Sequence, residues 1–464
     1  MSAAGWVDEL LLAGPDDAAC VTLGRSLTRA QLRQAVSERQ EALHAAGLRA
    51  GGTVALRMPP SLAFVANLLA AWRIGAQASL LDHRLTPYEV DNALARLAPQ
   101  VVVAGQAAPG GALRAFAEVT ETVTKHPGAP AATAHALIQL SSGSTGPSKV
   151  IGRTAQSLAA ELDRYSRIDG VPRAGERIVL LASMVHVLGL VGGLMYGLHT
   201  GAELVVPERL TVDAIADAIT ARPNPATLIG VPFHIELLAS VTTAPPLPQL
   251  IGMTTGGELV RAEVHERFVD RYGVRLGNMY GMTEVGVIAT DLFARHRPEL
   301  TPAPGLRVSE VGGELRVALP ESPYVGASAP DRFVDGWLLT RDAGAVDPDT
   351  GRFRVLGRLD SQVSVGGLKV DLTEVEHTLA ALPEVASAVV LHDGAIEAYV
   401  VPADPGADRE KVAEAIRAGL AERLAAFKRP RTLHVVDALP RTATGKLVRD
   451  RAALRTTVSA PAVS

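Results

Sequence analysis

The chain has 464 residues, of which 47% are hydrophobic and 20% charged, the profile of a soluble globular protein with two or three domains. The formal charge is −4 and no run of basic residues stands out, so a nucleic-acid partner is not expected. Cys20 is the single cysteine, which excludes an internal disulfide and a CxxC zinc site and favours a reducing cytoplasm.

Two stretches bear on membrane association. The first twelve residues carry Asp8 and Glu9 without a basic start, so no signal peptide is predicted. Residues 178–202 contain no Asp, Glu, Lys or Arg, and that length alone would suit a transmembrane helix. Because the stretch also holds polar residues and five glycines, we predict a buried strand and helix instead.

Local signals predict helices and strands in the first hundred residues. Thr28 and Gln31 form a capping box ahead of an apolar stripe that Gly47 closes, which predicts a helix. Thr86 and Glu89 form a second capping box, with proline at the first helical position. The other elements expected here are strands at 53–58 and 101–104 and a helix at 61–74. This alternation predicts doubly wound α/β layers.

The pattern changes twice further along the chain. Strand–helix alternation continues to about residue 280, and short strands with turns follow over 305–356. Beyond residue 360 the pattern is typical of a small α+β unit. We therefore predict an α/β protein whose large N-terminal domain, residues 1–359, has layered α/β subdomains and a β-rich subdomain. The predicted C-terminal domain, residues 360–464, is small, α+β and mobile.

A loop rich in glycine and hydroxyl groups follows the apolar strand predicted at 136–140. Its sequence is Ser141-Ser142-Gly143-Ser144-Thr145-Gly146-Pro147-Ser148-Lys149. Small residues let backbone N–H groups converge on an anion, and the hydroxyls and the lysine add donors and positive charge. Lys149 lacks the flanking Gly and Ser or Thr of a Walker A loop, which disfavours a P-loop phosphotransferase. By itself such a run is more often a plain surface loop.

Three further segments carry groups suited to nucleotide chemistry. In residues 278–284, Asn-Met-Tyr-Gly-Met-Thr-Glu, a carboxylate beside a hydroxyl suits Mg²⁺ and phosphate, and the tyrosine suits a base. Asp342 and Arg358 suit ribose hydroxyls and phosphate. Residues 439–446, Leu-Pro-Arg-Thr-Ala-Thr-Gly-Lys, place Lys446 on a loop near the C-terminus. Each segment alone is more often an ordinary strand end or exposed turn.

The order and spacing of these four segments resemble the adenylate-forming superfamily of acyl-CoA synthetases, peptide-synthetase adenylation domains and luciferases. The resemblance covers nearly the whole chain. Residues 140–154 look most like stand-alone aryl-acid ligases, and residues 184–190 look like the His-x-x-Gly stretch of acyl-CoA synthetases. One departure is Arg341, where the family usually has glycine. The resemblance implies ATP-dependent activation of a carboxylic acid as acyl-AMP, with release of pyrophosphate.

The resemblance also implies a role for each matching residue. Lys446 would bridge the carboxylate and the α-phosphate, Thr283 would contact the α-phosphate, and Glu284 would bind Mg²⁺. Asp342 and Arg358 would hold the ribose. The other nucleotide-binding positions that it implies are Ser141, Ser142, Gly143, Ser144, Thr145, Gly146, Lys149, Gly256, Gly257, Glu258 and Tyr280.

The chemistry of such a reaction explains the charges. A carboxylate and a triphosphate repel each other, so positive charge is needed where the pentacoordinate phosphorus forms, and Lys446 and Mg²⁺ would supply it. The family resemblance then implies rotation about a hinge at Asp360. This rotation would remove Lys446 and bring Gly366 and Gly367, in an acceptor tunnel, to a thiol.

His186, Val187, Val231 and Met282 are the predicted walls of the acid pocket. Amino-acid-activating relatives usually have Asp at the position of Val187, and hydroxybenzoate-activating relatives usually have Asn. Valine can take neither role, so we predict an uncharged aryl or medium aliphatic acid. His186 would border the carboxylate and act as a gate. A core histidine satisfied by backbone groups is the alternative for His186.

The acceptor stays open at this stage. CoA and the phosphopantetheine of an acyl or aryl carrier protein present the same thiol, and a nitrogen nucleophile is an alternative. Residues 428–431, Lys-Arg-Pro-Arg, would meet a CoA phosphate or an acidic carrier helix unless they form a solvated turn. A non-catalytic adenylate-binding regulator is disfavoured by the joint presence of Glu284, Asp342 and Lys446. We expect a cytoplasmic monomer or homodimer that acts on a small carboxylic acid, without nucleic-acid or membrane partners.

Overall fold

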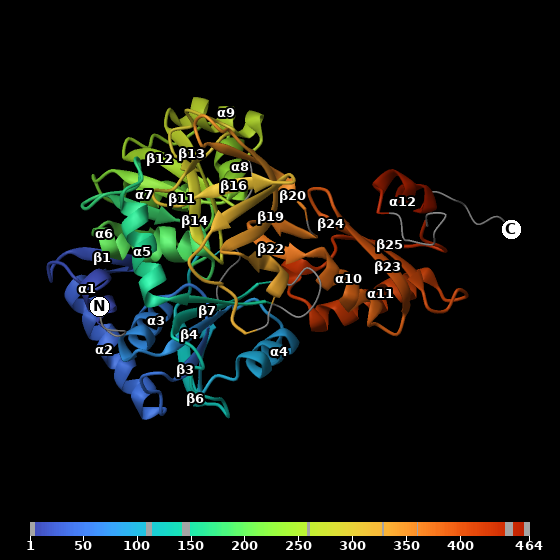
Figure 1. The fold of residues 1–464 in the computed structure, drawn as a ribbon, viewed down its shortest axis with the longest axis horizontal. Coiled ribbons are helices and arrows are strands. Elements are labelled where there is room, and N and C mark those ends of the chain that lie inside the picture. Colours follow the sequence, from blue (N-terminus) through green and yellow to red (C-terminus); the bar gives the residue numbers. More distant parts are fainter. Residues whose placement is uncertain are drawn as a thin grey trace. The chain divides into compact units, whose positions relative to one another are not determined.

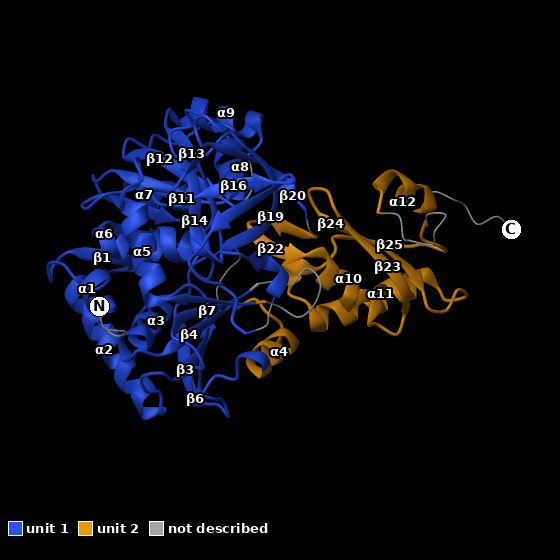
Figure 2. Ribbon diagram, viewed as in Figure 1, with its two compact units in different colours: residues 1–83, 96–140, 150–359 blue, residues 84–95, 141–149, 360–464 orange. Residues whose placement is uncertain are grey.

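The chain folds as two compact units (Figure 2). The computed structural model describes residues 5–107, 114–141, 149–257, 260–326, 329–359, 361–440 and 449–458. Unit 1 comprises residues 1–83, 96–140 and 150–359, and unit 2 comprises residues 84–95, 141–149 and 360–464. Each unit has its own hydrophobic core, as an independent domain requires.

A nine-stranded sheet forms the larger layer of unit 1 (Figure 1). Its strands, in spatial order, are β15 (Thr301–Pro302), β14 (Gly286–Asp291), β13 (Arg275–Met282), β12 (Leu250–Gly256), β11 (Ala226–Gly230), β9 (Arg177–Leu180), β10 (Glu203–Val206), β1 (Ala19–Leu23) and β2 (Arg25–Thr28). The six strands from β13 to β1 run parallel, and antiparallel strands extend both ends. The central strands are buried along their length, as parallel sheets covered on both faces require.

A second, six-stranded sheet lies in unit 1, except for Ser141 and Lys149, which are grouped in unit 2. Its strands, in spatial order, are β6 (Val119–Lys125), β5 (Val101–Ala107), β3 (Thr53–Arg57), β4 (Gln77–Leu81), β7 (His135–Ser141) and β8 (Lys149–Thr154). Strands β5, β3, β4 and β7 are parallel, and β6 is antiparallel at the edge. The doubly wound α/β layers predicted from the alternation of helices and strands are therefore confirmed.

Helices connect the strands of unit 1. Their bounds are α1 (Trp6–Leu10), α2 (Arg29–Ala45), α3 (Leu62–Ile74), α4 (Pro87–Leu97), α5 (Ala155–Ser166), α7 (Val212–Thr220), α8 (Pro232–Ser240) and α9 (Ala262–Tyr272), with most of α4 grouped in unit 2. The capping box of Thr28 and Gln31 starts α2 as predicted. Gly75 ends α3 in the left-handed conformation that glycine adopts without strain.

The uncharged segment 178–202 forms β9, then η1 (Leu188–Met195) and α6 (Tyr196–Thr200). The predicted buried strand and helix are confirmed, but η1 is a π-helix, which is rare and often found at functional sites. A Cβ on Gly189 would lie 2.2 Å from the carbonyl oxygen of Ser183, so this path requires glycine. No helix among the described residues is long and apolar enough to cross a bilayer.

A five-stranded antiparallel sheet completes unit 1. It consists of β16 (Val308–Val311), β17 (Glu314–Ala318), β19 (Trp337–Val346), β18 (Phe333–Val334) and β20 (Phe353–Arg358), with the short η2 (Pro330–Arg332) before β18. It shares a core with residues of β14 and β8, including Ile151 and Ile288. This sheet is the β-rich subdomain expected between residues 305 and 356.

Unit 2 has a small α+β fold after residue 360. Its elements there are β21 (Gln362–Val365), β22 (Leu368–Asp371), α10 (Leu372–Ala380), β23 (Val385–His392), β24 (Ile396–Pro402), α11 (Arg409–Arg423), η3 (Ala426–Lys428), β25 (Thr432–Val435) and α12 (Arg451–Val458). Helices α10 and α11 pack against the sheet of β23, β24 and β25 through Val375, Leu379, Ile416 and Leu420. The predicted fold class is thus confirmed for both units.

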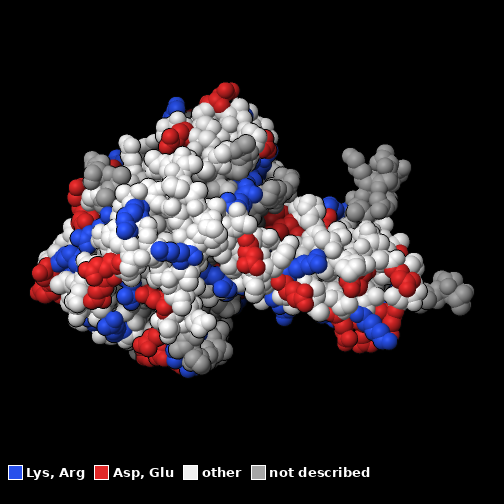
Figure 3. Space-filling view, turned by 90° about the horizontal axis from the view of Figure 1, so that it is seen from below, with Lys and Arg blue, Asp and Glu red and all other residues white. Residues whose placement is uncertain are grey.

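Charged side chains of both signs occur across the face of the molecule shown in Figure 3. Lysine and arginine alternate there with aspartate and glutamate over short distances. Neighbouring charges of opposite sign largely offset one another within a Debye length.

Candidate active site

Three predicted site residues, Gly256, Met282 and Ser141, lie at the ends of parallel strands. Gly256 ends β12 and Met282 ends β13, and in a parallel sheet such ends meet at one edge, where open α/β sheets bind ligands. Ser141 ends β7 and Lys149 begins β8, which are neighbours in the six-stranded sheet. Eight predicted positions, Ser142, Gly143, Ser144, Thr145, Gly146, Glu258, Asp360 and Lys446, lie outside the described residues.

The predicted ribose ligands form one hydrogen-bonded cluster. Asp342 on β19 lies directly across from Arg358 on β20, and Arg358 Nη1 is 3.0 Å from Asp342 Oδ1. The hydroxyl of Tyr280, on β13, donates to Asp342 Oδ2 at 2.5 Å. Burial, and then the Asp342 carboxylate, raise the pKa of Tyr280 well above its usual value. The phenol therefore stays protonated and holds Asp342 in place.

Arg341 occupies the position where the resembled family usually has glycine, and its backbone shows why. Its φ is +60°, in the left-handed region that side chains other than glycine rarely adopt. Its N–H donates to Glu314 Oε1 at 2.8 Å, and its guanidinium pairs with Asp331 at 3.0 Å. These contacts hold the strained residue and leave the neighbouring Asp342 in its cluster.

Thr283 and Glu284 lie in the turn between β13 and β14. Glu284 is 8% exposed, and its Oε1 accepts a hydrogen bond from the Tyr324 hydroxyl at 2.9 Å. The described residues contain no group of three or more metal-binding side chains. One carboxylate nevertheless fits Mg²⁺ well, since that ion is usually held by one or two carboxylates together with substrate phosphates.

A buried ion pair supports the turn between β13 and β14. This pair was not identified from the sequence. Arg153 Nη2 on β8 lies 2.8 Å from Glu161 Oε2 on α5, and their side chains are 6% and 0% exposed. Glu161 Oε1 accepts the N–H of Val287, which follows the turn, at 3.0 Å. Glu161 and Val287 are 126 residues apart in the chain, so no local pattern could have paired them.

The predicted walls of the acid pocket come from three of the strand ends. His186 and Val187 follow β9 and precede η1, Val231 lies between β11 and α8, and Met282 ends β13. Val231 is buried, His186 has a side chain that is 45% exposed, and the other two are half-buried. These four positions stay a prediction for the acid pocket, and His186 is not a fully buried core histidine.

Asp82 was not among the predicted site residues, yet it lies beside His186. It follows β4, and its Oδ2 is 3.7 Å from His186 Nε2, while its Oδ1 is 3.6 Å from His83 Nδ1. The side chain of Asp82 is 10% exposed. Gln139, near the end of β7, donates from Nε2 to the carbonyl oxygen of Val185 at 2.7 Å. This bond links the loop that carries His186 to the six-stranded sheet, which also contains β4.

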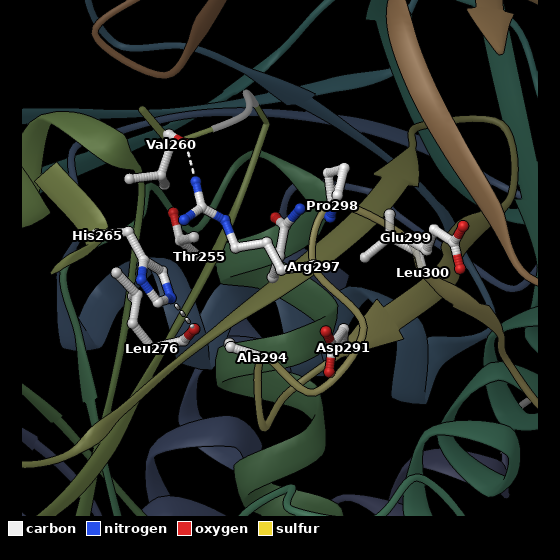
Figure 4. A pocket seen from close by; sticks show the side chains of 12 residues that line it. Thr255, Val260, His265, Leu276, Asp291, Ala294, Arg297, Pro298, Glu299 and Leu300 are labelled. Atoms are coloured by element: carbon white, nitrogen blue, oxygen red, sulfur yellow. Dashed lines mark hydrogen bonds between the residues drawn. The ribbon is translucent and has the colours of Figure 1, made fainter. Parts of the chain in front are cut away.

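A pocket opens beside the strand ends of β12, β13 and β14 (Figure 4). Thr255, Asn278 and Asp291 are register partners on these three strands and line it together. The hydroxyl oxygen of Thr255 is buried without a hydrogen-bond partner among the described residues. Arg297 reaches across the pocket and donates to the carbonyl oxygen of Val260. Two lining residues, Thr255 and Asn278, are close in sequence to Gly256 and Tyr280, which are predicted nucleotide-binding positions.

The two predicted acceptor glycines form a tight hairpin turn in unit 2. Gly366 and Gly367 join β21 to β22 and have φ values of +57° and +80°. A two-residue turn with positive φ at both positions is strongly favoured by glycine. Nothing lies within 4 Å of a Cβ built on Gly366, so its place in the turn, not crowding, accounts for glycine there.

The basic cluster at 428–431 is largely engaged within unit 2. Lys428 Nζ lies 2.8 Å from carboxylate oxygens of both Glu89 and Glu374, and its side chain is 12% exposed. Arg429 donates to the carbonyl oxygens of Leu424 and Ala421. Lys428 and Arg429 therefore stabilise the fold of unit 2. Lys428 is neither a solvated turn residue nor open to an acceptor, the two interpretations drawn from the sequence.

Comparison with known proteins agrees with this geometry. The family model described as AMP-binding enzyme matches residues 11–326, and the model described as AMP-binding enzyme C-terminal domain matches residues 374–446. A 3-hydroxybenzoate–CoA/4-hydroxybenzoate–CoA ligase of Thauera aromatica is 28% identical over 92% of this chain and 91% of its own length.

Two solved structures have the same fold. One is o-succinylbenzoate CoA synthetase of Bacillus subtilis, with a TM-score of 0.81, 23% identity and coverage of 96% of this chain and 97% of that one. The other is amide bond synthetase McbA of Marinactinospora thermotolerans, with a TM-score of 0.76, 25% identity and coverage of 97% and 98%. Because the two family models match well over half of the chain, the protein belongs to the AMP-binding enzyme family of adenylate-forming acid ligases.

Proposed function

We propose that this protein activates an aryl carboxylic acid with ATP and transfers the acyl group to the thiol of CoA. The observation that carries the proposal is the Asp342 cluster, in which Arg358 and the Tyr280 hydroxyl hold one buried carboxylate. Such a carboxylate can accept hydrogen bonds from the paired hydroxyls of a ribose. Tyr280 lies on β13, which ends at Met282 two residues before Glu284, so the proposed nucleotide and acid sites would share this strand.

The reaction would consist of two nucleophilic steps, the first at the α-phosphorus of ATP and the second at the acyl carbon. The acid's carboxylate oxygen would attack the α-phosphorus, the bond to the β-phosphate would break, and pyrophosphate would leave. The thiol sulfur would then attack the acyl carbon, AMP would leave, and the thiol proton would pass to solvent. Lys446 would stabilise the first transition state, and Thr283 would contact the α-phosphate. Mg²⁺ bound at Glu284 would neutralise phosphate charge.

The pocket walls support an uncharged ring as the acid. Val187 and Val231 present no carboxylate to an α-ammonium group, so an amino acid would find no partner for its charge at these two positions. The related ligase of Thauera aromatica is named for hydroxybenzoates, which favours an aryl acid over a medium aliphatic one. His186, whose Nε2 lies 3.7 Å from Asp82 Oδ2, is the polar side chain among the four predicted walls and would meet a ring substituent or the carboxylate.

CoA is the acceptor that the comparisons favour, since the Thauera aromatica relative is named as a CoA ligase. A nitrogen nucleophile is the second candidate, because an amide bond synthetase shares the fold over almost the whole chain. A carrier-protein phosphopantetheine would present the same thiol chemistry as CoA. These three acceptors give products of different mass, so one assay can tell them apart.

The test is acid-dependent release of pyrophosphate from Mg-ATP over benzoate, hydroxybenzoates, medium aliphatic acids and amino acids. We expect release with aryl acids, loss of at least about 100-fold in Lys446→Ala, and an acyl-CoA product when CoA is added. Amide product with an amine but no thioester with CoA would favour the second candidate. An α-amino acid as the fastest substrate would contradict the proposed pocket.

A further inference from the structure

The backbone of the Glu284 turn is fixed by groups outside the proposed nucleotide site. Glu161 Oε1 accepts the Val287 N–H at 3.0 Å, and Arg153 holds the other oxygen of the same carboxylate at 2.8 Å. A Cβ on Gly286 would lie 1.9 Å from Glu161 Oε1, so glycine lets the carboxylate approach the turn. The backbone of the turn is therefore held by Glu161 on α5, which Arg153 on β8 holds in turn.

The Glu284 side chain has a separate support. Its Oε1 accepts the Tyr324 hydroxyl at 2.9 Å, and the two residues are 8% and 7% exposed. Within the described part of the chain, Oε2 has no hydrogen-bond partner.

Tyr324 is itself anchored to β8. It forms a β-bridge with Ile151, the Gly152 N–H donates to the Pro323 carbonyl oxygen at 2.9 Å, and the Val325 N–H donates to the Val150 carbonyl oxygen at 2.9 Å. Arg153, which holds Glu161, lies on the same strand. One strand thus supports both the backbone of the turn and the orientation of its carboxylate.

We propose that Tyr324 is a positioning residue for the divalent cation that accompanies the nucleotide. Its hydroxyl fixes Glu284 Oε1 and leaves Oε2 for the cation, while Glu161 keeps the backbone in place. This inference rests on the proposed function, because it takes Glu284 as the metal-binding carboxylate. Partners that orient a metal ligand in this way typically change metal affinity by about 10–100-fold when removed.

The test uses Tyr324→Phe in the full chain, which removes only the hydroxyl. Binding of the α,β-methylene analogue of ATP is measured twice, as its Mn²⁺ complex by electron paramagnetic resonance and metal-free in EDTA. We expect the Kd of the Mn²⁺ complex to rise about 10-fold and that of the metal-free analogue to stay within about 2-fold. The Mg²⁺ concentration for half-maximal pyrophosphate release should rise by a similar factor, with the rate largely restored at high Mg²⁺.

Tyr272→Phe is the matched control, since the Tyr272 hydroxyl donates to the Leu238 carbonyl oxygen at 3.0 Å and lies outside the proposed site. It should change neither Kd. Equal weakening of both forms in Tyr324→Phe, or no weakening of either, would overturn the positioning role. Failure of the wild type to release pyrophosphate would count against the proposed function alone, because the two Kd values require no turnover.

Discussion

His234 is kept neutral by its position at the start of α8. It is 5% exposed, and its Nδ1 accepts the N–H of Val231 at 3.1 Å. Burial lowers the pKa of His234 to about 4. His234 is thus a helix cap, which satisfies the backbone N–H of Val231.

Acid should destabilise the fold through this residue. Between its unfolded pKa, roughly 6.5, and about 4, the unfolded chain binds a proton that the folded chain excludes, so stability falls as pH falls. His234→Asn keeps an acceptor for the Val231 N–H and removes the titration. From pH 6.5 to 5, we expect the wild type to lose ~2 kcal/mol more than this variant in urea unfolding. Parallel pH dependence in the two proteins would contradict the role of His234.

At the scale of elements, β8 and α5 form a joint support for the turn after β13. The Arg153–Glu161 pair is almost fully buried, and both of its members also bind backbone groups or Ser157. A buried pair contributes little net stability against apolar replacements, but losing one partner leaves an uncompensated charge. Replacing one member of the Arg153–Glu161 pair should therefore lower the free energy of unfolding more than replacing both members.

Glu161→Gln should cost ~3–5 kcal/mol of unfolding free energy, since Arg153 would keep its charge without a carboxylate. Arg153→Met in the same chain should recover much of the loss, because glutamine still accepts the Val287 N–H. Asp163→Asn is the control on the same helix, where the Asp163–Arg167 pair is solvent-exposed and should cost under ~0.5 kcal/mol. Similar losses in Glu161→Gln and Asp163→Asn would show that the buried pair is not structural.

Elements with local signals were predictable from the sequence, and long-range pairs were not. Thr86 and Glu89 form the second capping box as predicted, because its partners are three residues apart. The bond between Tyr324 and Glu284 spans 40 residues and that between Glu161 and Val287 spans 126. Such pairs depend on strand order, which propensity and spacing do not determine. A helix was predicted for the segment of η1, but its π-helical form was not.

At the scale of the whole molecule, the two units have separate cores and the single thiol belongs to one of them. Cys20 lies on β1 in unit 1, is 1% exposed, and donates through Sγ to the Leu27 carbonyl oxygen. Burial raises its pKa to about 11. The thiol is therefore inert in the folded protein, and its reaction with a reagent reports opening of unit 1.

Labelling of Cys20 should distinguish the unfolding of the two units. Asp371, which is fully buried and caps α10 in unit 2, can be replaced by alanine to destabilise that unit. We expect Asp371→Ala to leave the labelling rate at pH 8 within about 2-fold, and Glu161→Gln to raise it at least 10-fold. A large increase in Asp371→Ala would mean that the units unfold together.

The order of strands in the nine-stranded sheet has a consequence for synthesis on the ribosome. Strand β1 ends at Leu23, and its parallel neighbour β10 begins at Glu203. At about 5–20 residues per second, roughly 10–40 s pass between the emergence of the two strands. During that interval β1 has only β2 beside it in the sheet, and a lone two-stranded hairpin is marginal in water. The β1–β2 hairpin therefore cannot take its place in the nine-stranded sheet until β10 has been synthesised.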